Sequence, residues 1–157
     1  MAKREVVTQK LQAVLPEDAV CKDDSLKAGV VFSAQVPIGK LREAIKACDE
    51  SEYYLESITA LDFQDTFELV YHLNCYEAAS RIALRVLCGH DQSPATVSDI
   101  FPSALWQERE VHDFFGIRFA DSPDLRPLLM PEDADYYPLK KTFGTVHAYH
   151  KREEIYG

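Results

Sequence analysis

The chain has 157 residues, of which 46% are hydrophobic, and this length and composition suit a single domain with a hydrophobic core. Its 17 basic and 26 acidic residues give a formal net charge of −9, and no window gathers the Lys and Arg needed to neutralise a phosphate backbone, so we expect no nucleic-acid partner. No stretch approaches the roughly 20 apolar residues that span a bilayer, so we expect any membrane contact to go through other proteins.

The first part of the chain predicts two helices with one strand between them. Residues 4–16 place Val7 and Leu11 at helical spacing and end at a proline, which indicates a short amphipathic helix. Apolar residues alternate with polar ones in residues 28–37, the pattern of a strand. Residues 38–50 return to helical spacing, which is typical of a helix that lies on a sheet.

Three strands are predicted next, over residues 53–63, 66–76 and 80–88. The connections between them are short and polar, as they are between antiparallel neighbours. The middle strand is apolar on one face and polar on the other, so we expect one covered face and one face at least partly in water, with His72 on the solvent side.

A third helix is predicted within residues 99–116. Ser98 is its expected cap, Pro102 stands where a first helical residue is favoured, and Gly116 has the place of a C-terminal capping glycine.

No stable periodicity follows in residues 120–157, which contain four prolines. Loops of more than about 12 to 15 residues are uncommon in compact domains, and the leucines and aromatics of this segment are too apolar to remain in water. We therefore predict an α/β (α+β) fold with a mixed, mostly antiparallel sheet and packed helices. Residues 1–119 form its compact domain, and residues 120–157 form an extended C-terminal arm that packs on a partner subunit.

The cysteines do not indicate a metal or cluster site. Cys21, Cys48, Cys75 and Cys88 are far apart in the sequence, whereas zinc and iron-sulfur sites usually take ligands from closely spaced pairs. Each lies near the end of a predicted helix or strand, where a reduced thiol acts as a small buried hydrophobe.

The segment WQEREVHDFFGIRF, residues 106–119, mixes charges with aromatic residues. On a helix, Glu108 can pair with His112 and Arg109 with Asp113, because each pair is four residues apart. Charges among apolar neighbours need partners, and the planar group of Arg109 suits a carboxylate or the carbonyls of a neighbouring chain.

A small acid-base enzyme is an alternative interpretation, with His112 acting beside Glu108 or Asp113. The sequence lacks a nucleophile elbow, a glycine-rich phosphate loop and the HExxH motif, which weighs against catalysis. His147 and His150 can bind a metal if that segment is helical, but we expect them to lie in solvent.

The run EREVHDFFGIRFADSPDLRPLL resembles the signature of the 30-kDa subunit family of respiratory complex I, which includes the C subunit of NADH:quinone oxidoreductase. In that signature a Glu-Arg-Glu triplet, an aspartate, a glycine and an Asp-Leu-Arg segment follow one another, and later elements resemble the family's closing Pro-Leu-Arg-Lys run. The matching positions are Glu108, Arg109, Glu110, Asp113, Phe114, Phe115, Gly116, Asp124, Leu125, Arg126, Pro138, Leu139, Lys140 and Lys141.

Three positions depart from the family pattern. His112 stands where tyrosine is usual, Ser122 where histidine is usual, and Lys140 where arginine is common. Because lysine cannot make the bidentate contact of arginine, that contact is expected to differ. These departures and the compact chain also fit the equivalent subunit of an energy-converting membrane-bound [NiFe] hydrogenase or formate hydrogenlyase.

The resemblance implies a non-redox scaffold subunit of a proton-translocating oxidoreductase, without independent catalysis. Such a subunit binds no cofactor itself, while the complex uses iron-sulfur clusters with NADH/FMN and quinone, or a nickel-iron centre. Its partners are the large quinone-site or hydrogenase-like subunit and neighbouring iron-sulfur subunits, and its place is peripheral, on the cytoplasmic side of the cell membrane. The implied partner-binding residues are Glu108, Arg109, Glu110, Asp113, Phe115, Gly116, Asp124, Leu125, Arg126, Pro138, Lys140 and Lys141. We expect Arg126, Lys140 and Lys141 to face acidic groups or carbonyls of the large subunit.

Overall fold

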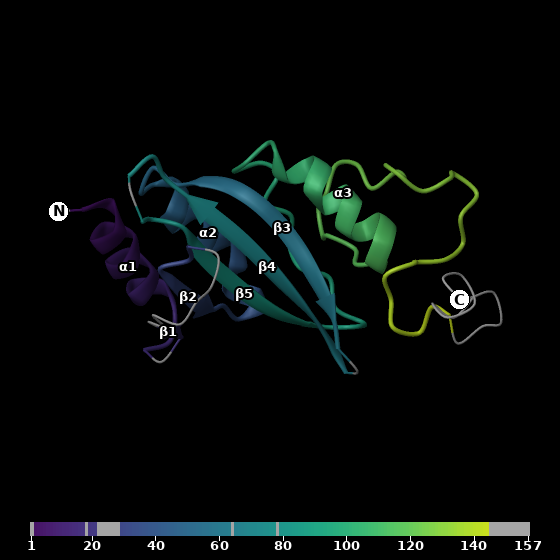
Figure 1. Ribbon diagram of the computed structural model, residues 1–157, viewed down its shortest axis with the longest axis horizontal. Coiled ribbons are helices and arrows are strands. Elements are labelled where there is room, and N and C mark those ends of the chain that lie inside the picture. Colours follow the sequence, from purple (N-terminus) through teal and green to yellow (C-terminus); the bar gives the residue numbers. More distant parts are fainter. Residues whose placement is uncertain (1, 18, 22–28, 64, 78, 145–157) are drawn as a thin grey trace, which may run out of the picture.

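The structure is a computed structural model that describes residues 2–17, 19–21, 29–63, 65–77 and 79–144 (Figure 1). Its elements are α1 (Lys3–Val14), β1 (Val20–Cys21), β2 (Phe32–Gln35), the 3-10 helix η1 (Ile38–Lys40), α2 (Leu41–Asp49), β3 (Tyr54–Asp62), β4 (Thr66–Asn74), β5 (Ile82–Gly89) and α3 (Ala104–Phe115). The helices and strands predicted from the sequence are present, and β1 is a short strand that the pattern did not indicate.

The strands form one sheet in the order β1-β2-β5-β4-β3. The strands β3, β4 and β5 follow one another as an antiparallel meander, while β2 pairs with β5 in parallel and β1 pairs with β2 antiparallel. The predicted mixed, mostly antiparallel sheet is therefore confirmed.

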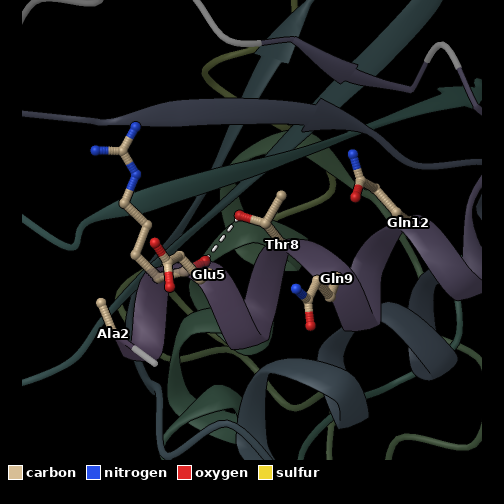
Figure 2. Close-up of a pocket in the computed structure, with 6 residues that line it drawn as sticks. Ala2, Glu5, Thr8, Gln9 and Gln12 are labelled. Atoms are coloured by element: carbon tan, nitrogen blue, oxygen red, sulfur yellow. Dashed lines mark hydrogen bonds between the residues drawn. The ribbon is translucent and has the colours of Figure 1, made fainter.

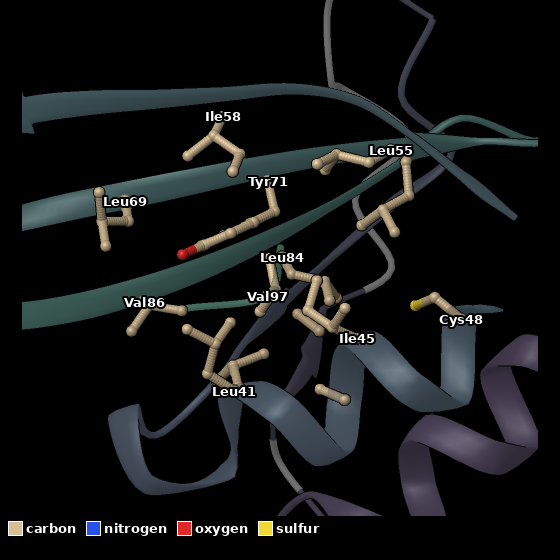
Figure 3. Packing of buried hydrophobic residues seen from close by; sticks show 14 of the residues in the cluster. Leu41, Ile45, Cys48, Leu55, Ile58, Leu69, Tyr71, Leu84, Val86 and Val97 are labelled. Carbon is tan, nitrogen blue, oxygen red and sulfur yellow. The ribbon is translucent and has the colours of Figure 1, made fainter. Parts of the chain in front are cut away.

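The helices cover one face of this sheet. Leu41, Ile45 and Cys48 of α2 point toward the sheet, where Tyr71 and Leu84 lie in the same buried cluster (Figure 3). Their spacing along α2 follows the helical repeat, which places them on a single face. The fold thus buries one apolar face of the sheet under its helices, as antiparallel sheets commonly do.

The helix α3 packs against the same face of the sheet. The ring of Phe115 in α3 meets the ring of Phe67 in β4 edge-on, with centroids 6.3 Å apart. On the other face, His72 is half-buried and its Nδ1 lies 3.1 Å from the Ser57 hydroxyl. His72 therefore lies on the face away from the helices, as predicted.

The start of α3 differs from the prediction. The helix begins at Ala104 rather than at Pro102, because the preceding residues form turns in which the amide of Phe101 donates to the carbonyl of Val97 and the amide of Ala104 donates to the carbonyl of Phe101. Its end is as predicted, since Gly116 has a left-handed φ of 73° and its amide donates to the carbonyl of His112.

Three of the cysteines, Cys48, Cys75 and Cys88, are free thiols buried in the core. Burial raises the pKa of the Cys48 thiol well above its ordinary value, which keeps the thiol protonated. The expectation of structural thiols is confirmed for these three, while the side chain of Cys21 lies outside the described residues.

Candidate functional site

The charged residues of α3 hold the first part of the arm. Asp113 is buried, and its Oδ2 atom accepts hydrogen bonds from three consecutive backbone amides: Leu128 at 3.0 Å, Leu129 at 2.7 Å and Met130 at 2.8 Å. Burial favours a higher pKa for Asp113, but the three amide donors together outweigh it, and the pKa lies below its ordinary value. An ionised Asp113 therefore fixes residues 128–130 against the helix.

Arg109 binds the arm one turn earlier on the same helix. Its Nε donates to the carbonyl of Arg126 at 3.0 Å and a terminal nitrogen donates to the carbonyl of Pro127 at 2.9 Å. Another terminal nitrogen lies 3.5 Å from the carboxylate of Asp124. The guanidinium also lies over the ring of Trp106, 5.1 Å from its centroid, so Arg109 contacts both the helix and the arm.

Asp124 and Arg126 form a local pair within the arm. The guanidinium of Arg126 donates to both carboxylate oxygens of Asp124, at 3.0 and 2.9 Å, and the amide of Arg126 donates to the same group. The hydrogen bonds from the side chain and the amide of Arg126, and then the charges of Arg109 and Arg126, hold the pKa of Asp124 far below its ordinary value. This turn directs the neighbouring carbonyls toward Arg109.

A second attachment lies at the C-terminal end of α3. The amide of Leu139 donates to the carbonyl of Phe114 at 3.0 Å. A Cβ atom added at Gly116 would lie only 2.7 Å from the ring of Tyr137, so that ring lies directly on the glycine. Further along, the amide of Lys141 donates to Asp62 in β3 at 2.7 Å. The arm therefore leaves α3, turns back and contacts the domain again.

Glu108 serves the domain rather than the arm. It is fully buried, and its carboxylate accepts hydrogen bonds from the Thr96 hydroxyl at 2.6 Å and the Val97 amide at 2.8 Å. Burial raises the pKa of Glu108, and these two hydrogen bonds oppose that rise. The amide of Thr96 in turn donates to the carbonyl of Ala120, so Glu108 supports the segment against which the arm begins.

Two interactions predicted from the sequence are wrong. Glu108 turns toward Thr96 instead of pairing with His112, and Arg109 and Asp113 both turn to the arm instead of pairing with each other. The reason is burial, because the face of α3 that carries Glu108 packs on the domain while the arm supplies backbone partners beside it. The Nδ1 of His112 lies 3.0 Å from the carbonyl of Ile117, near the helix end.

The other predicted partner-binding residues fall into two groups. Phe115 is buried, while Leu125, Pro138 and Lys140 are half-buried, and the ammonium group of Lys140 lies 5.0 Å from the ring centroid of Tyr137. Glu110, Arg126 and Lys141 are exposed. The exposed group can reach another protein, whereas the buried residues shape this chain itself.

This geometry does not favour the acid-base enzyme. Glu108 is enclosed by the domain, Asp113 accepts three backbone amides of the arm, and His112 faces a backbone carbonyl, so the three side chains serve three different places. In the part of the chain that the structure describes, no three His, Cys, Asp or Glu side chains are grouped as metal ligands would be. His147 and His150 lie outside the described residues.

A hollow of about 560 Å³ lies beside α1. Figure 2 shows the residues that line it, and Figure 1 shows α1 at the end of the molecule far from α3. It is lined by Ala2 and by residues of that one helix, including Glu5, Gln9 and Gln12. The hydroxyl of Thr8 is used within the helix, where it donates to the carbonyl of Arg4. The hollow is therefore the polar outer side of an amphipathic helix, without convergent chemical groups.

Sequence reasoning missed three residues of this arrangement: Asp62, Thr96 and Tyr137. Asp62 and Thr96 lie outside the signature in the sequence, and the residues around them give no sign that they contact α3 or the arm. The contact of Tyr137 could have been predicted, because an aromatic residue in a segment without periodicity needs a surface to pack on, and a glycine at a helix end leaves room for a ring.

The sequence and the fold now define the class of protein. Residues 34–149 match the family described as "Respiratory-chain NADH dehydrogenase, 30 Kd subunit", and the chain belongs to this family.

The relatives of this chain include the C subunits of several bacterial NADH-quinone oxidoreductases. That of Roseobacter denitrificans is 35% identical over 90% of this chain and 70% of the relative, and that of a Roseiflexus species is 33% identical over 86% and 80%. The counterpart from Ruegeria pomeroyi is 43% identical over 59% of this chain and 48% of the relative. The matched part is thus about half the length of that relative and of several others.

A solved structure has the same fold. A chain of the membrane-bound sulfane sulfur reductase, an archaeal respiratory membrane complex, superposes with a TM-score of 0.76 at 27% identity, over 93% of this chain and 88% of that one. Among the residues that the structure describes here, no helix is both long and apolar enough to cross a bilayer.

Proposed function

We propose that the chain is a non-redox scaffold subunit of a membrane-associated respiratory oxidoreductase of the NADH:quinone type. It contributes a docking surface to the peripheral part of the complex, on the cytoplasmic side, and the complex supplies the FMN, iron-sulfur and quinone chemistry. The partners are the large quinone-site subunit and the neighbouring iron-sulfur subunits.

One observation carries this proposal. The charged residues of the family signature are occupied in building the support of the arm, since Asp113 binds three of its amides and Arg109 binds two of its carbonyls. A segment held in this way without forming helix or strand is suited to presenting a shaped surface to another subunit. The membership of the family agrees with such a role.

The second candidate is the equivalent subunit of an energy-converting [NiFe] hydrogenase or a related membrane complex. It is favoured by the structural similarity to a chain of an archaeal respiratory membrane complex whose named activity is sulfane sulfur reduction. The same fold therefore occurs in assemblies with different named activities, and the scaffold role is common to both candidates.

The test is to purify the tagged chain from native membranes in a mild detergent. Co-purification of a flavin-containing NADH-oxidising subunit supports the first candidate, whereas nickel in the purified complex supports the second. We expect the isolated chain to turn over neither NADH nor hydrogen. A chain that purifies alone from membranes, and whose deletion leaves the respiratory activities of those membranes unchanged, would contradict the scaffold role.

A further inference from the structure

The part of the arm between its two attachments exposes large apolar side chains. This arm loop, residues 129–139, is fixed at its start by Asp113 and at its end by the carbonyl of Phe114. The exposed fractions are 64% for Leu129, 43% for Tyr136 and 54% for Leu139. Apolar groups of this size held out on an anchored segment indicate a contact with another protein.

The place of the arm loop in the fold leaves these side chains accessible. The arm loop runs beyond α3, at the end of the molecule farthest from α1 (Figure 1). Trp106 on α3 is also 58% exposed, and the guanidinium of Arg109, which binds the start of the arm, lies over its ring. The backbone attachments of the loop do not use the side chains of Leu129 and Leu139, while the exposed ring of Tyr136 stacks on that of Phe143, with centroids 5.3 Å apart.

The exposed charges of the arm loop have one sign. Glu132, Asp133 and Asp135 are exposed, and residues 129–139 contain neither lysine nor arginine. The basic residues on either side each have a contact within the chain, because Arg126 pairs with Asp124 and the ammonium groups of Lys140 and Lys141 lie over aromatic rings. A partner consequently meets apolar groups flanked by three carboxylates.

We propose that the arm loop docks into a partner surface that is apolar at its centre and rich in arginine and lysine at its rim. The proposal rests on the proposed scaffold function and names the chemistry of the partner at that site. Complementary charges of this kind steer association and fix the orientation of the partners. The expectation from the sequence, that Arg126, Lys140 and Lys141 face acidic groups or carbonyls of the large subunit, stays a separate prediction.

The experiment replaces the native chain in the membrane complex by the variant E132K/D133K/D135K. The matched control is E5K/E17K/D49K, which changes the net charge equally at exposed acids outside the arm. The fraction of chain that co-purifies with the complex is measured at several salt concentrations. We expect the arm variant to bind at least about tenfold more weakly, and the control to bind as wild type does.

Hydrogen exchange of the amides of residues 128–130 reports whether the arm of the variant is still attached. If the lysine variant fails to fold, the neutral variant E132Q/D133N/D135N decides, and it should weaken binding and reduce its dependence on salt. Arm variants that assemble with the affinity and salt dependence of wild type would overturn the proposal while leaving the scaffold function standing. If the wild-type chain itself fails to co-purify with a respiratory complex, the scaffold function fails instead.

Discussion

The attachment of the arm to Asp113 makes the substitution Asp113→Asn a direct test of the arrangement around α3. The amide side chain has nearly the same shape as the carboxylate, so it preserves packing while removing the negative charge. One oxygen of Asp113 now accepts three amide hydrogens, with donor–acceptor distances no longer than 3.0 Å. A neutral amide oxygen accepts two hydrogen bonds well, so we expect at least one of the three to be lost.

The size of the effect follows from the difference between charged and neutral hydrogen bonds. Bonds to charged groups contribute about 1.5 to 3 kcal/mol each, and neutral bonds about 0.5 to 1.5 kcal/mol. Over three bonds to a buried group the difference amounts to roughly 3 kcal/mol in the free energy of opening the arm. Since about 1.4 kcal/mol corresponds to a factor of ten, the amides of residues 128–130 should exchange with solvent about 100-fold faster.

The assay is native-state hydrogen exchange, with Glu110→Gln as the control. Glu110 is an exposed carboxylate on the same helix, so its substitution removes an equal charge without touching the arm. We expect exchange in the core strands to be unchanged in both variants. If residues 128–130 exchange no faster in Asp113→Asn than in the control, the carboxylate does not hold the arm and this account of α3 is wrong.

Three further predictions concern neighbouring positions. Gly116→Ala should lower the free energy of unfolding more than Gly29→Ala does. Both glycines have a positive φ, which costs about 1 to 2 kcal/mol for alanine, but only at Gly116 would the added Cβ clash with Tyr137. Chemical denaturation of the two variants measures the difference, and equal losses would argue against the contact. The wild type should lose stability relative to Glu108→Gln as the pH rises above the ordinary pKa of glutamate, about 4.3. The reason is that the raised pKa of Glu108 makes the native state hold more protons than the unfolded state in that range. Denaturation at several pH values tests the sign of this change, and an opposite slope would refute it. Arg109→Lys should lower the free energy of opening the start of the arm by about 1 to 2 kcal/mol, because lysine has no planar group that can donate to two carbonyls at once. The fluorescence of the chain's single tryptophan, Trp106, should change as well, because the guanidinium lies over its ring. An unchanged spectrum together with unchanged exchange in the arm would contradict the role of Arg109.

The parts of the fold that depend on local periodicity were predictable from the sequence. The apolar spacing of Leu41, Ile45 and Cys48 determines which face of α2 meets the sheet, and Gly116 marks the end of α3 by its conformational freedom. The start of α3 was predicted less well. A proline is favoured at the first turn of a helix but also in the turns that precede one, and Pro102 lies in such a turn.

The partners of the charged residues were not predictable in the same way. A spacing of four residues places Arg109 near Asp113 on any helix, and only the position of the arm, set by packing, decides that both bind backbone groups instead. Glu108 illustrates the same limit, because its burial depends on the segment around Thr96, and no local pattern shows which segment will cover a helix. The strand β1 was missed because two residues form no readable alternation.

The parallel pairing of β2 with β5 has a consequence for synthesis of the chain. Phe32 pairs with Ile82, so β2 leaves the ribosome about 50 residues before the strand beside which it lies in the finished sheet. At about 5 to 20 residues per second, β2 waits roughly 3 to 10 seconds with only the two-residue β1 available as a neighbour. The meander β3, β4 and β5 has no such delay, because each strand follows its partner directly. We therefore expect nascent chains that stop before β5 to leave one edge of β2 unpaired and to depend on chaperones, while chains that include β5 can pair every strand of the sheet.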